Sequence, residues 1–509
     1  MFALQARQDF WSLFQRITYQ SVRAMSGMQE GVELMARPGS STSFFERAWE
    51  RLSRNWKEIA FSGTKGVNLD LAKGGKSDLN HLKKNLKACL EARGGEVSAR
   101  AQAAELGRLY LHQDAAGRET FLKTLAQDFG PRHEAVQAAL ENLQASPEGS
   151  KGYYAAEREL INALTPDSIR VLKLFSSLPN GVKFLVDLRA DLLTLSEQEP
   201  ATEALSAHLK DLLSSWFDPG ILDLERITWK SSAALLEKLI AYEAVHEIRS
   251  WDDLRNRLDS DRRCYALFHP RMPEEPLAFV EVALGDGYAG SIQHLLDEAA
   301  PAFDTAKADT AIFYSISNTQ KGLQGIAFGE YLIKLVVQRL KSEMPQVRRY
   351  ATLSPVPGLV PWLKTLTDER IASFLSTDHR KVLCEMSNTD TTVSALQELT
   401  RQPEGLLVSE VSERLKEPLL TLAACYFQEK RDDGQPIDPV ARFHLRNGAR
   451  LERINWLGDS SSRGLKQSLG IMVNYGYRPD ELDRNHEAYM KDGRIALASE
   501  VKTLLKKAR

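Results

Sequence analysis

The chain has 509 residues, of which 43% are hydrophobic and 26% are charged, the proportions of an ordinary soluble globular protein. Its 66 Lys and Arg residues against 68 Asp and Glu residues give a formal net charge of -2, so no overall field favours a nucleic acid or a membrane surface as a partner. The length exceeds what one hydrophobic core usually fills and predicts several domains.

Residues 1–79 predict an N-terminal extension, helical with flexible loops. Residues 44–61 have apolar side chains at helical spacing, whereas residues 37–43 and 62–77 are rich in Gly, Ser and Lys. Polar side chains interrupt the start of the chain too often for a secretory signal, and no apolar run is long enough to cross a membrane. Three arginines make a mitochondrial presequence an alternative, but Asp9 and several aromatic residues weigh against it. A cytoplasmic protein is the simplest interpretation.

Residues 80–216 predict an all-α helical bundle. Several segments carry apolar side chains at three- and four-residue intervals, with Gly or Pro at their ends. These segments are residues 97–113, 117–130, 131–146 and 178–195. In the last of them, Asn180 is expected to cap the helix. No fixed-period repeat occurs, so a bundle is expected rather than a solenoid.

Residues 217–509 predict an α/β domain with a sheet, because short β-rich runs alternate with helical patterns. The expected strands are residues 263–269, 277–284, 310–317, 347–354, 441–447 and 449–457. The expected helices are residues 291–300, 329–344 and 411–430. The fold class is therefore α+β, an N-terminal helical bundle followed by a sheet-containing domain.

One strand, loop and helix predict a phosphate-binding turn. The strand AIFYSIS leads through NTQKGLQGIAFG into the helix EYLIKLVVQRLK, so a glycine-bearing loop feeds a helix N-terminus. Neither G-x-x-x-x-G-K-[ST] nor G-x-G-x-x-G is present. The string from Gln324 to Gly329 resembles the Q/R-x-x-G/A-x-G/A motif with which GNAT acyltransferases grip the pyrophosphate of coenzyme A. Without further support, an ordinary glycine-bearing helix start explains it equally well.

The cysteines and histidines do not predict a metal site. The four cysteines are scattered with no C-x-x-C pair, which is typical of reduced thiols, and no histidines have H-x-x-x-H spacing. We therefore expect no metal site.

Longer strings resemble the malonyl-CoA decarboxylase family, over roughly residues 95 to 490. They are TAIFYSISNTQKGLQGI, GEYLIKLVVQRLKSEMP, YATLSPVPGLVPWL and PVARFHLRNGARLERINWLGD, with ILDLERITWKS and VKFLVDLRADLL upstream. The resemblance implies a helical N-terminal domain, which assembles a homotetramer, and a GNAT-like catalytic domain that binds acyl-CoA. It also implies conversion of malonyl-CoA to acetyl-CoA and CO2 without a cofactor, in fatty-acid or malonate metabolism.

The resemblance also implies site residues. Ser354, in L-S-P-V-P-G, matches the family's active-site serine, and His444, in F-H-L-R-N-G, matches its active-site histidine. The loop that would hold the CoA pyrophosphate comprises Gln324, Gly325, Ile326, Ala327, Phe328, Gly329 and Glu330. Some relatives carry an acidic residue where this chain has Ala327, so a role for that carboxylate does not transfer.

The chemistry explains why these residues would suffice. The thioester carbonyl accepts the electron pair when CO2 leaves, and the resulting enolate must be stabilised and protonated at carbon. Pro355 favours an extended Ser354, whose hydroxyl is expected to project beyond the sheet edge. His444 is expected on a strand and is assigned the proton donation, because histidine titrates near neutral pH. Judged without the resemblance, Ser354 would be a turn-capping serine and His444 an interior histidine.

Other residues and functions stay open. Tyr314, Ser315 and Ser317 contribute either packing or one substrate-facing side of a strand, and His269 is expected to be structural. A GNAT-type acyltransferase that moves an acyl group to an amine is the second candidate function. A non-catalytic acyl-CoA sensor or helical scaffold is the third.

Overall fold

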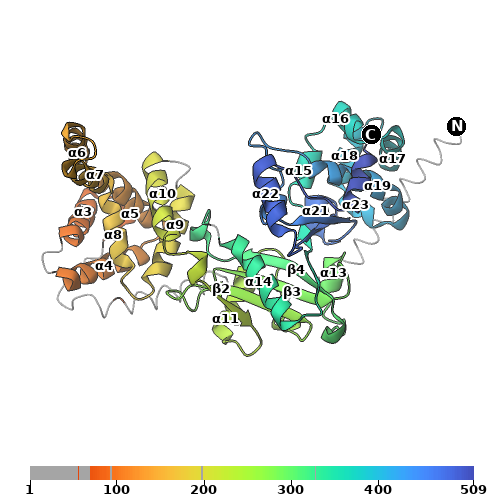
Figure 1. Ribbon diagram of the computed structural model, residues 1–509, viewed down its shortest axis with the longest axis horizontal. Helices are drawn as coiled ribbons and strands as arrows, with labels where there is room; N and C mark the ends of the chain where they lie inside the picture. The colour runs from red at the N-terminus through yellow and green to blue at the C-terminus, as the bar shows by residue number, and fades with distance from the viewer. Residues whose placement is uncertain (1–55, 57–68, 92–94, 196–198, 327, 509) are drawn as a thin grey trace.

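The computed structural model describes Trp56 and residues 69–91, 95–195, 199–326 and 328–508. An N-terminal helical region is followed by a region built on a mixed sheet, as the sequence predicts (Figure 1). In Figure 1 the early helices lie on one side of the sheet, and the helices late in the chain lie on the other. Of the helix predicted over residues 44–61, only Trp56 lies within the described residues.

The helical region begins before the predicted boundary, since part of the segment predicted as a loop is helical. Leu71–Lys73 form a 3-10 helix, η1, and α3 starts at Lys76. The helices of this region are α3 (Lys76–Glu91), α4 (Gly95–Leu111), α5 (Ala115–Asp128), α6 (His133–Ala145), α7 (Lys151–Leu164), α8 (Asp167–Phe175), α9 (Gly181–Leu195) and α10 (Pro200–Ser214). Asn180 precedes α9 with a φ of 55°, and its main-chain carbonyl accepts a hydrogen bond from the Phe184 N–H.

The sheet has eight strands in the order β1-β2-β3-β4-β5-β8-β6, and β7 also pairs with β8. They are β1 (Asp223–Ile227), β2 (Arg262–Phe268), β3 (Ala278–Gly285), β4 (Thr310–Asn318), β5 (Arg349–Thr352), β6 (Ser354–Pro355), β7 (Arg450–Asn455) and β8 (Met472–Gly476). Only β4 and β5 pair in parallel among the described strands. The sequence predicts β2, β3, β4, β5 and β7, reaches only the first residue of β6, and misses β1 and β8.

Helices cover the sheet and fill the C-terminal part. They are α11 (Ala233–Tyr242), α12 (Trp251–Arg257), α13 (Ile292–Leu295), α14 (Gly329–Glu343), α15 (Leu359–Leu363), α16 (Asp368–Phe374), α17 (Thr377–Ser387), α18 (Thr392–Arg401), α19 (Ser409–Tyr426), α20 (Pro439–Arg446), α21 (Ser462–Ser468), α22 (Leu482–Asp492) and α23 (Ser499–Lys506). The sequence predicts α14 and α19 well, whereas the helix predicted over residues 291–300 is the much shorter α13. In the part of the chain that is described, no helix is both long and apolar enough to cross a membrane.

The strand predicted over residues 441–447 is wrong, because this segment forms α20. The Asp438 carboxylate accepts a hydrogen bond from the Ala441 N–H at 2.7 Å and caps the helix. Pro439 follows at the first helical position, where its missing N–H has no cost. His444 therefore lies in the last turn of a helix and not on a strand.

Candidate active site

The candidate site lies where β4 and β5 part. The two strands pair from Thr310 to Phe313 on β4, and the chain after β5 then pairs with β8 through Ser354. Because parallel strands run in the same direction, the loop after β4 and Ser354 after β5 both lie toward the same edge of the sheet. The topology thus brings the predicted phosphate loop and the predicted serine to one edge.

Ser354 and His444, 90 residues apart in sequence, meet at this edge. The Ser354 Oγ lies 3.2 Å from the His444 Nε2, and both side chains are buried. The expected projection of Ser354 beyond the sheet is wrong. Its pairing with Val473 on β8 keeps it inside the sheet, with 6% of its surface exposed.

The second nitrogen of His444 is also bonded. Its Nδ1 lies 2.7 Å from the Tyr477 Oη, and its ring stacks on Tyr475 with centroids 4.5 Å apart. Tyr475 and Tyr477 alternate from β8, so their side chains lie on the same side of the sheet. That alternation in N-Y-G-Y was the signal in the sequence from which Tyr477 could have been found.

Burial sets the charge of His444. It is 3% exposed, and desolvation lowers its pKa to about 3, since no carboxylate among the described residues offsets the burial. The imidazole is therefore neutral at neutral pH, contrary to the expectation that it titrates there. A neutral ring with partners on both nitrogens can pass a proton from one to the other.

Thr352 and Asn474 hold Ser354 in place. The Ser354 hydroxyl donates to the Thr352 Oγ1 at 2.8 Å, and that oxygen also accepts the Tyr475 N–H at 3.1 Å. The Asn474 amide donates to the Thr352 carbonyl at 2.7 Å and to the Ala289 carbonyl at 3.0 Å. A rigid hydrogen-bonded support of this kind fixes a reacting group within a fraction of an ångström.

The predicted phosphate loop passes through η4 (Lys321–Leu323) into α14. Gln324 and Gly325 are exposed, Ile326 is partly buried and Phe328 is buried at the N-cap. Phe328 offers no side-chain acceptor, and its carbonyl accepts the Tyr331 N–H at 3.0 Å. The N–H groups of Gly329 and Glu330, at the start of α14, are left to other acceptors. Ala327 lies outside the described residues.

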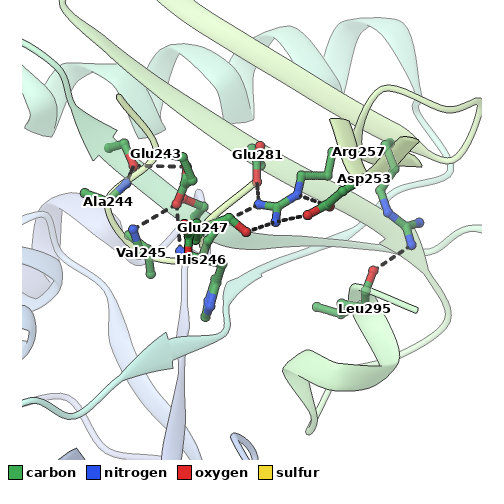
Figure 2. A network of polar contacts seen from close by, with 12 residues as sticks. Glu243, Ala244, Val245, His246, Glu247, Asp253, Arg257, Glu281 and Leu295 are labelled. Atoms are coloured by element: carbon green, nitrogen blue, oxygen red, sulfur yellow. Dashed lines mark hydrogen bonds and ion pairs between the residues drawn. The ribbon is translucent and has the colours of Figure 1, made fainter. Parts of the chain in front are cut away.

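Ser315 and Ser317 face a different set of partners. Their hydroxyls donate to the Glu243 carboxylate at distances from 2.7 to 3.1 Å, which ties the chain after α11 to β4. Figure 2 shows Glu243, which also accepts hydrogen bonds from the Val245 and His246 N–H groups, and Arg257, whose guanidinium bridges Asp253 and Glu281. These contacts favour a structural role for the two serines.

His269 also has structural partners. The His269 ring nitrogens lie 3.0 Å from the Trp216 carbonyl and 3.1 Å from the Arg271 nitrogen. No group of three or more His, Cys, Asp or Glu side chains within the described residues is arranged to hold a metal ion.

Comparisons with known proteins identify relatives of this chain. Residues 129–217 match the model of the malonyl-CoA decarboxylase N-terminal domain, and residues 220–509 match that of the malonyl-CoA decarboxylase C-terminal domain. The mitochondrial malonyl-CoA decarboxylase of Anser anser anser is 37% identical over 79% of this chain and 83% of its own length. The enzyme of Rattus norvegicus, also named mitochondrial, is 36% identical over 77% and 82%.

Solved structures give the same result. The crystal structure of malonyl-CoA decarboxylase from Rhodopseudomonas palustris is 40% identical, with a TM-score of 0.73 over 84% of this chain and 99% of that one. The structure from Agrobacterium vitis is 39% identical, with a TM-score of 0.75 over the same shares. This chain belongs to the malonyl-CoA decarboxylase family.

Proposed function

We propose that the protein decarboxylates malonyl-CoA to acetyl-CoA and CO2. The observation that carries the proposal is the buried contact of 3.2 Å between the Ser354 Oγ and the His444 Nε2. Ser354 follows β5 and the glycine-bearing loop follows the neighbouring parallel strand β4, so one extended thioester could bind the loop through its phosphates and reach the buried pair with its acyl end.

In the first step, the bond between the malonyl carboxylate and the adjacent carbon breaks. Its electron pair moves into the thioester and forms an enolate, while CO2 leaves. The buried pair offers neutral hydrogen-bond donors in a low-dielectric setting, where such donors stabilise a developing oxyanion more strongly than water does. This step uses no electron sink other than the substrate's own carbonyl.

In the second step, the enolate carbon takes a proton and acetyl-CoA forms. The Ser354 hydroxyl gives its proton to the carbon, and the His444 Nε2–H replaces it. The Tyr477 hydroxyl, 2.7 Å from the His444 Nδ1, gives its proton to that nitrogen and keeps the ring neutral, and solvent reprotonates Tyr477. Proton exchange with solvent then returns the ring from the Nδ1–H to the Nε2–H tautomer before the next turnover. The enolate of a thioester is a far stronger base than a serine alkoxide, so the transfer is downhill.

The test is turnover of malonyl-CoA labelled in its free carboxyl group, with no acyl acceptor present. We expect labelled CO2 and acetyl-CoA in equal amounts. If free CoA appeared only when an amine was added, the chain would be an acyltransferase. Tight malonyl-CoA binding by folded protein without turnover would instead identify a sensor.

We also propose that the helical region assembles the chains into a homo-oligomer, in the family's tetrameric form. The α6–α7 hairpin buries only Ala139 and Ala156 fully, and it leaves Ile161 60% exposed and Tyr154 57% exposed. A helix with so much exposed apolar surface is typical of an interface, here with a second copy. Light scattering should show an assembly for the native chain and a smaller species for Ile161→Glu, and a monomeric native chain would refute the proposal.

Cytoplasmic location and a role in fatty-acid or malonate metabolism stay predictions. The relatives from goose and rat carry the word mitochondrial in their names, which describes those proteins. Fractionation of the source cells tests the location.

A further inference from the structure

The helical region touches the phosphate loop through its main chain. A Cβ on Gly322 would lie 1.7 Å from the Val186 carbonyl oxygen of α9, so only glycine allows this approach. Buried apolar residues continue across the contact, with Val186 on one side and Leu323 on the other. The loop is therefore shaped by α9 as much as by the strand and helix that flank it.

Arg189 of α9 adds a buried positive charge beneath the same loop. Its Nη1 donates to the Gly322 carbonyl at 2.5 Å and to the Gln324 carbonyl at 3.0 Å, and only 3% of the residue is exposed. Among the described residues, no carboxylate lies within ion-pair distance of Arg189, and burial lowers its pKa. Buried charges are usually paired, so a cation without a counter-ion here favours an anion bound at the loop.

Lys210 of α10 brings a second positive charge next to Gly325 of the loop. Its Cε and Nζ lie 3.3 Å from the position that a Cβ on Gly325 would occupy. The residue is half-buried, and no carboxylate of the described chain forms an ion pair with its ammonium group. Gly325 has a φ of 79°, in the left-handed region that glycine adopts freely. Because it also has no side chain, the lysine can approach the main chain of the loop at this position.

We propose that Lys210, supplied by the helical region, binds the phosphate groups of coenzyme A, and that Arg189 is a positioning residue that holds the loop for them. The inference rests on the proposed function and extends it, since the substrate site then includes both regions of the chain. A lysine ammonium is a compact charge that suits a phosphate, and each such charge-assisted hydrogen bond strengthens binding without touching the reacting carbon.

The experiment compares malonyl-CoA with malonyl-pantetheine, which has the same reacting end but no phosphates. We expect Lys210→Met to raise the KM for malonyl-CoA about tenfold and to leave kcat nearly unchanged. Its kcat/KM for malonyl-pantetheine should equal that of the native protein. Lys84→Met, which removes an exposed lysine from α3, is the matched control and should leave the KM and kcat for both substrates unchanged.

Competition by free CoA gives a second readout. Lys210→Met should weaken inhibition by CoA and leave inhibition by pantetheine unchanged. The weaker inhibition should show a shallower dependence on salt than in the native protein, because one charge contact is lost. Arg189→Lys, which keeps the charge but loses the forked geometry, should raise the KM for malonyl-CoA with little change in kcat.

Two results would overturn the inference. One is an unchanged KM for malonyl-CoA in Lys210→Met; the other is an equal loss on malonyl-CoA and malonyl-pantetheine. Calorimetric binding of CoA separates this inference from the proposed function. If native protein bound CoA but did not decarboxylate malonyl-CoA, weaker CoA binding by Lys210→Met would still support the phosphate contact, and unchanged binding would refute it.

Discussion

His444 is a neutral, doubly bonded imidazole and not a free acid with a pKa near neutrality. Burial lowers its pKa to about 3, and Ser354 and Tyr477 occupy its two nitrogens. A malonyl carboxylate entering beside the ring would raise that pKa, since a nearby negative charge favours the imidazolium. The histidine is thus suited to relay protons and becomes more basic only when substrate is present.

The low pKa has a consequence for stability. An unfolded histidine has a pKa near 6.5, so the unfolded chain binds a proton at this residue below that pH while the folded chain does not until about pH 3. The stabilising contribution is therefore complete above pH 6.5 and is lost as the pH falls toward 3. Between pH 7.5 and 5 the native protein should lose about 2 kcal/mol that His444→Gln does not lose.

Urea unfolding at the two pH values measures this difference. His246, whose pKa burial lowers to about 4, is common to both proteins and cancels in the comparison. A parallel loss of stability in the native protein and the variant would show that His444 is already protonated in the fold.

Tyr477 is expected to affect the rate of decarboxylation through its contact with His444. Tyr477→Phe removes the hydroxyl that lies 2.7 Å from the Nδ1 and leaves the ring in place. We expect kcat to fall by about 10- to 100-fold, because the Tyr477 hydroxyl is the last proton donor in the proposed path through His444 to Ser354. The Kd for CoA should stay unchanged. Tyr489→Phe, which removes a hydroxyl from α22 that has no partner among the described residues, is the control. A native kcat in Tyr477→Phe would remove the tyrosine from the relay.

At the scale of elements, the contact between α9 and the loop depends on one glycine. Gly322→Ala would place a methyl group 1.7 Å from a main-chain oxygen, which no side-chain rotation relieves. We expect a loss of about 1–3 kcal/mol in the free energy of unfolding and a raised KM for malonyl-CoA. Gly130→Ala, whose nearest neighbour would lie at 3.8 Å, should be close to neutral in a denaturant titration. If Gly322→Ala were as stable as Gly130→Ala, the close contact between Gly322 and the Val186 carbonyl would be wrong.

The sequence predicts some elements well for clear reasons. β3 and β4 have continuous apolar runs bounded by polar turns, and α14 has a strong helical period. The segment around His444 has seven residues in which a period of two and a period of 3.6 look alike, so it is predicted as a strand. The capping pair Asp438 and Pro439 was the stronger signal and indicates a helix.

The residues of the candidate site could be predicted only in part. Ser354 and His444 come from family resemblance, and local pattern alone would give them structural roles. Tyr477 lies 33 residues from His444, and Arg189 lies 135 residues from Gln324, so both contacts exist only in the folded chain. No local pattern in the helical region indicates that α9 and α10 reach a loop of the sheet region.

At the scale of the whole molecule, the helical and sheet regions share one buried apolar cluster. Its members include Leu185 on α9, Leu323 and Phe328 in the loop, and Leu332 on α14. A continuous core of this kind couples the two regions, so we expect one calorimetric unfolding transition, shifted upward as a unit by saturating CoA. Two transitions, with CoA moving only one of them, would mean that the regions are independent.

The most direct measurement compares kcat for native protein and Ser354→Ala with malonyl-CoA, alongside the Kd of each for CoA. The serine hydroxyl is the group that gives its proton to the enolate carbon, and its removal leaves the phosphate loop untouched. We predict a fall in kcat of about 10²- to 10⁴-fold with an unchanged Kd. A Ser354→Ala protein that releases CO2 at the native rate would contradict the proposed role of the pair.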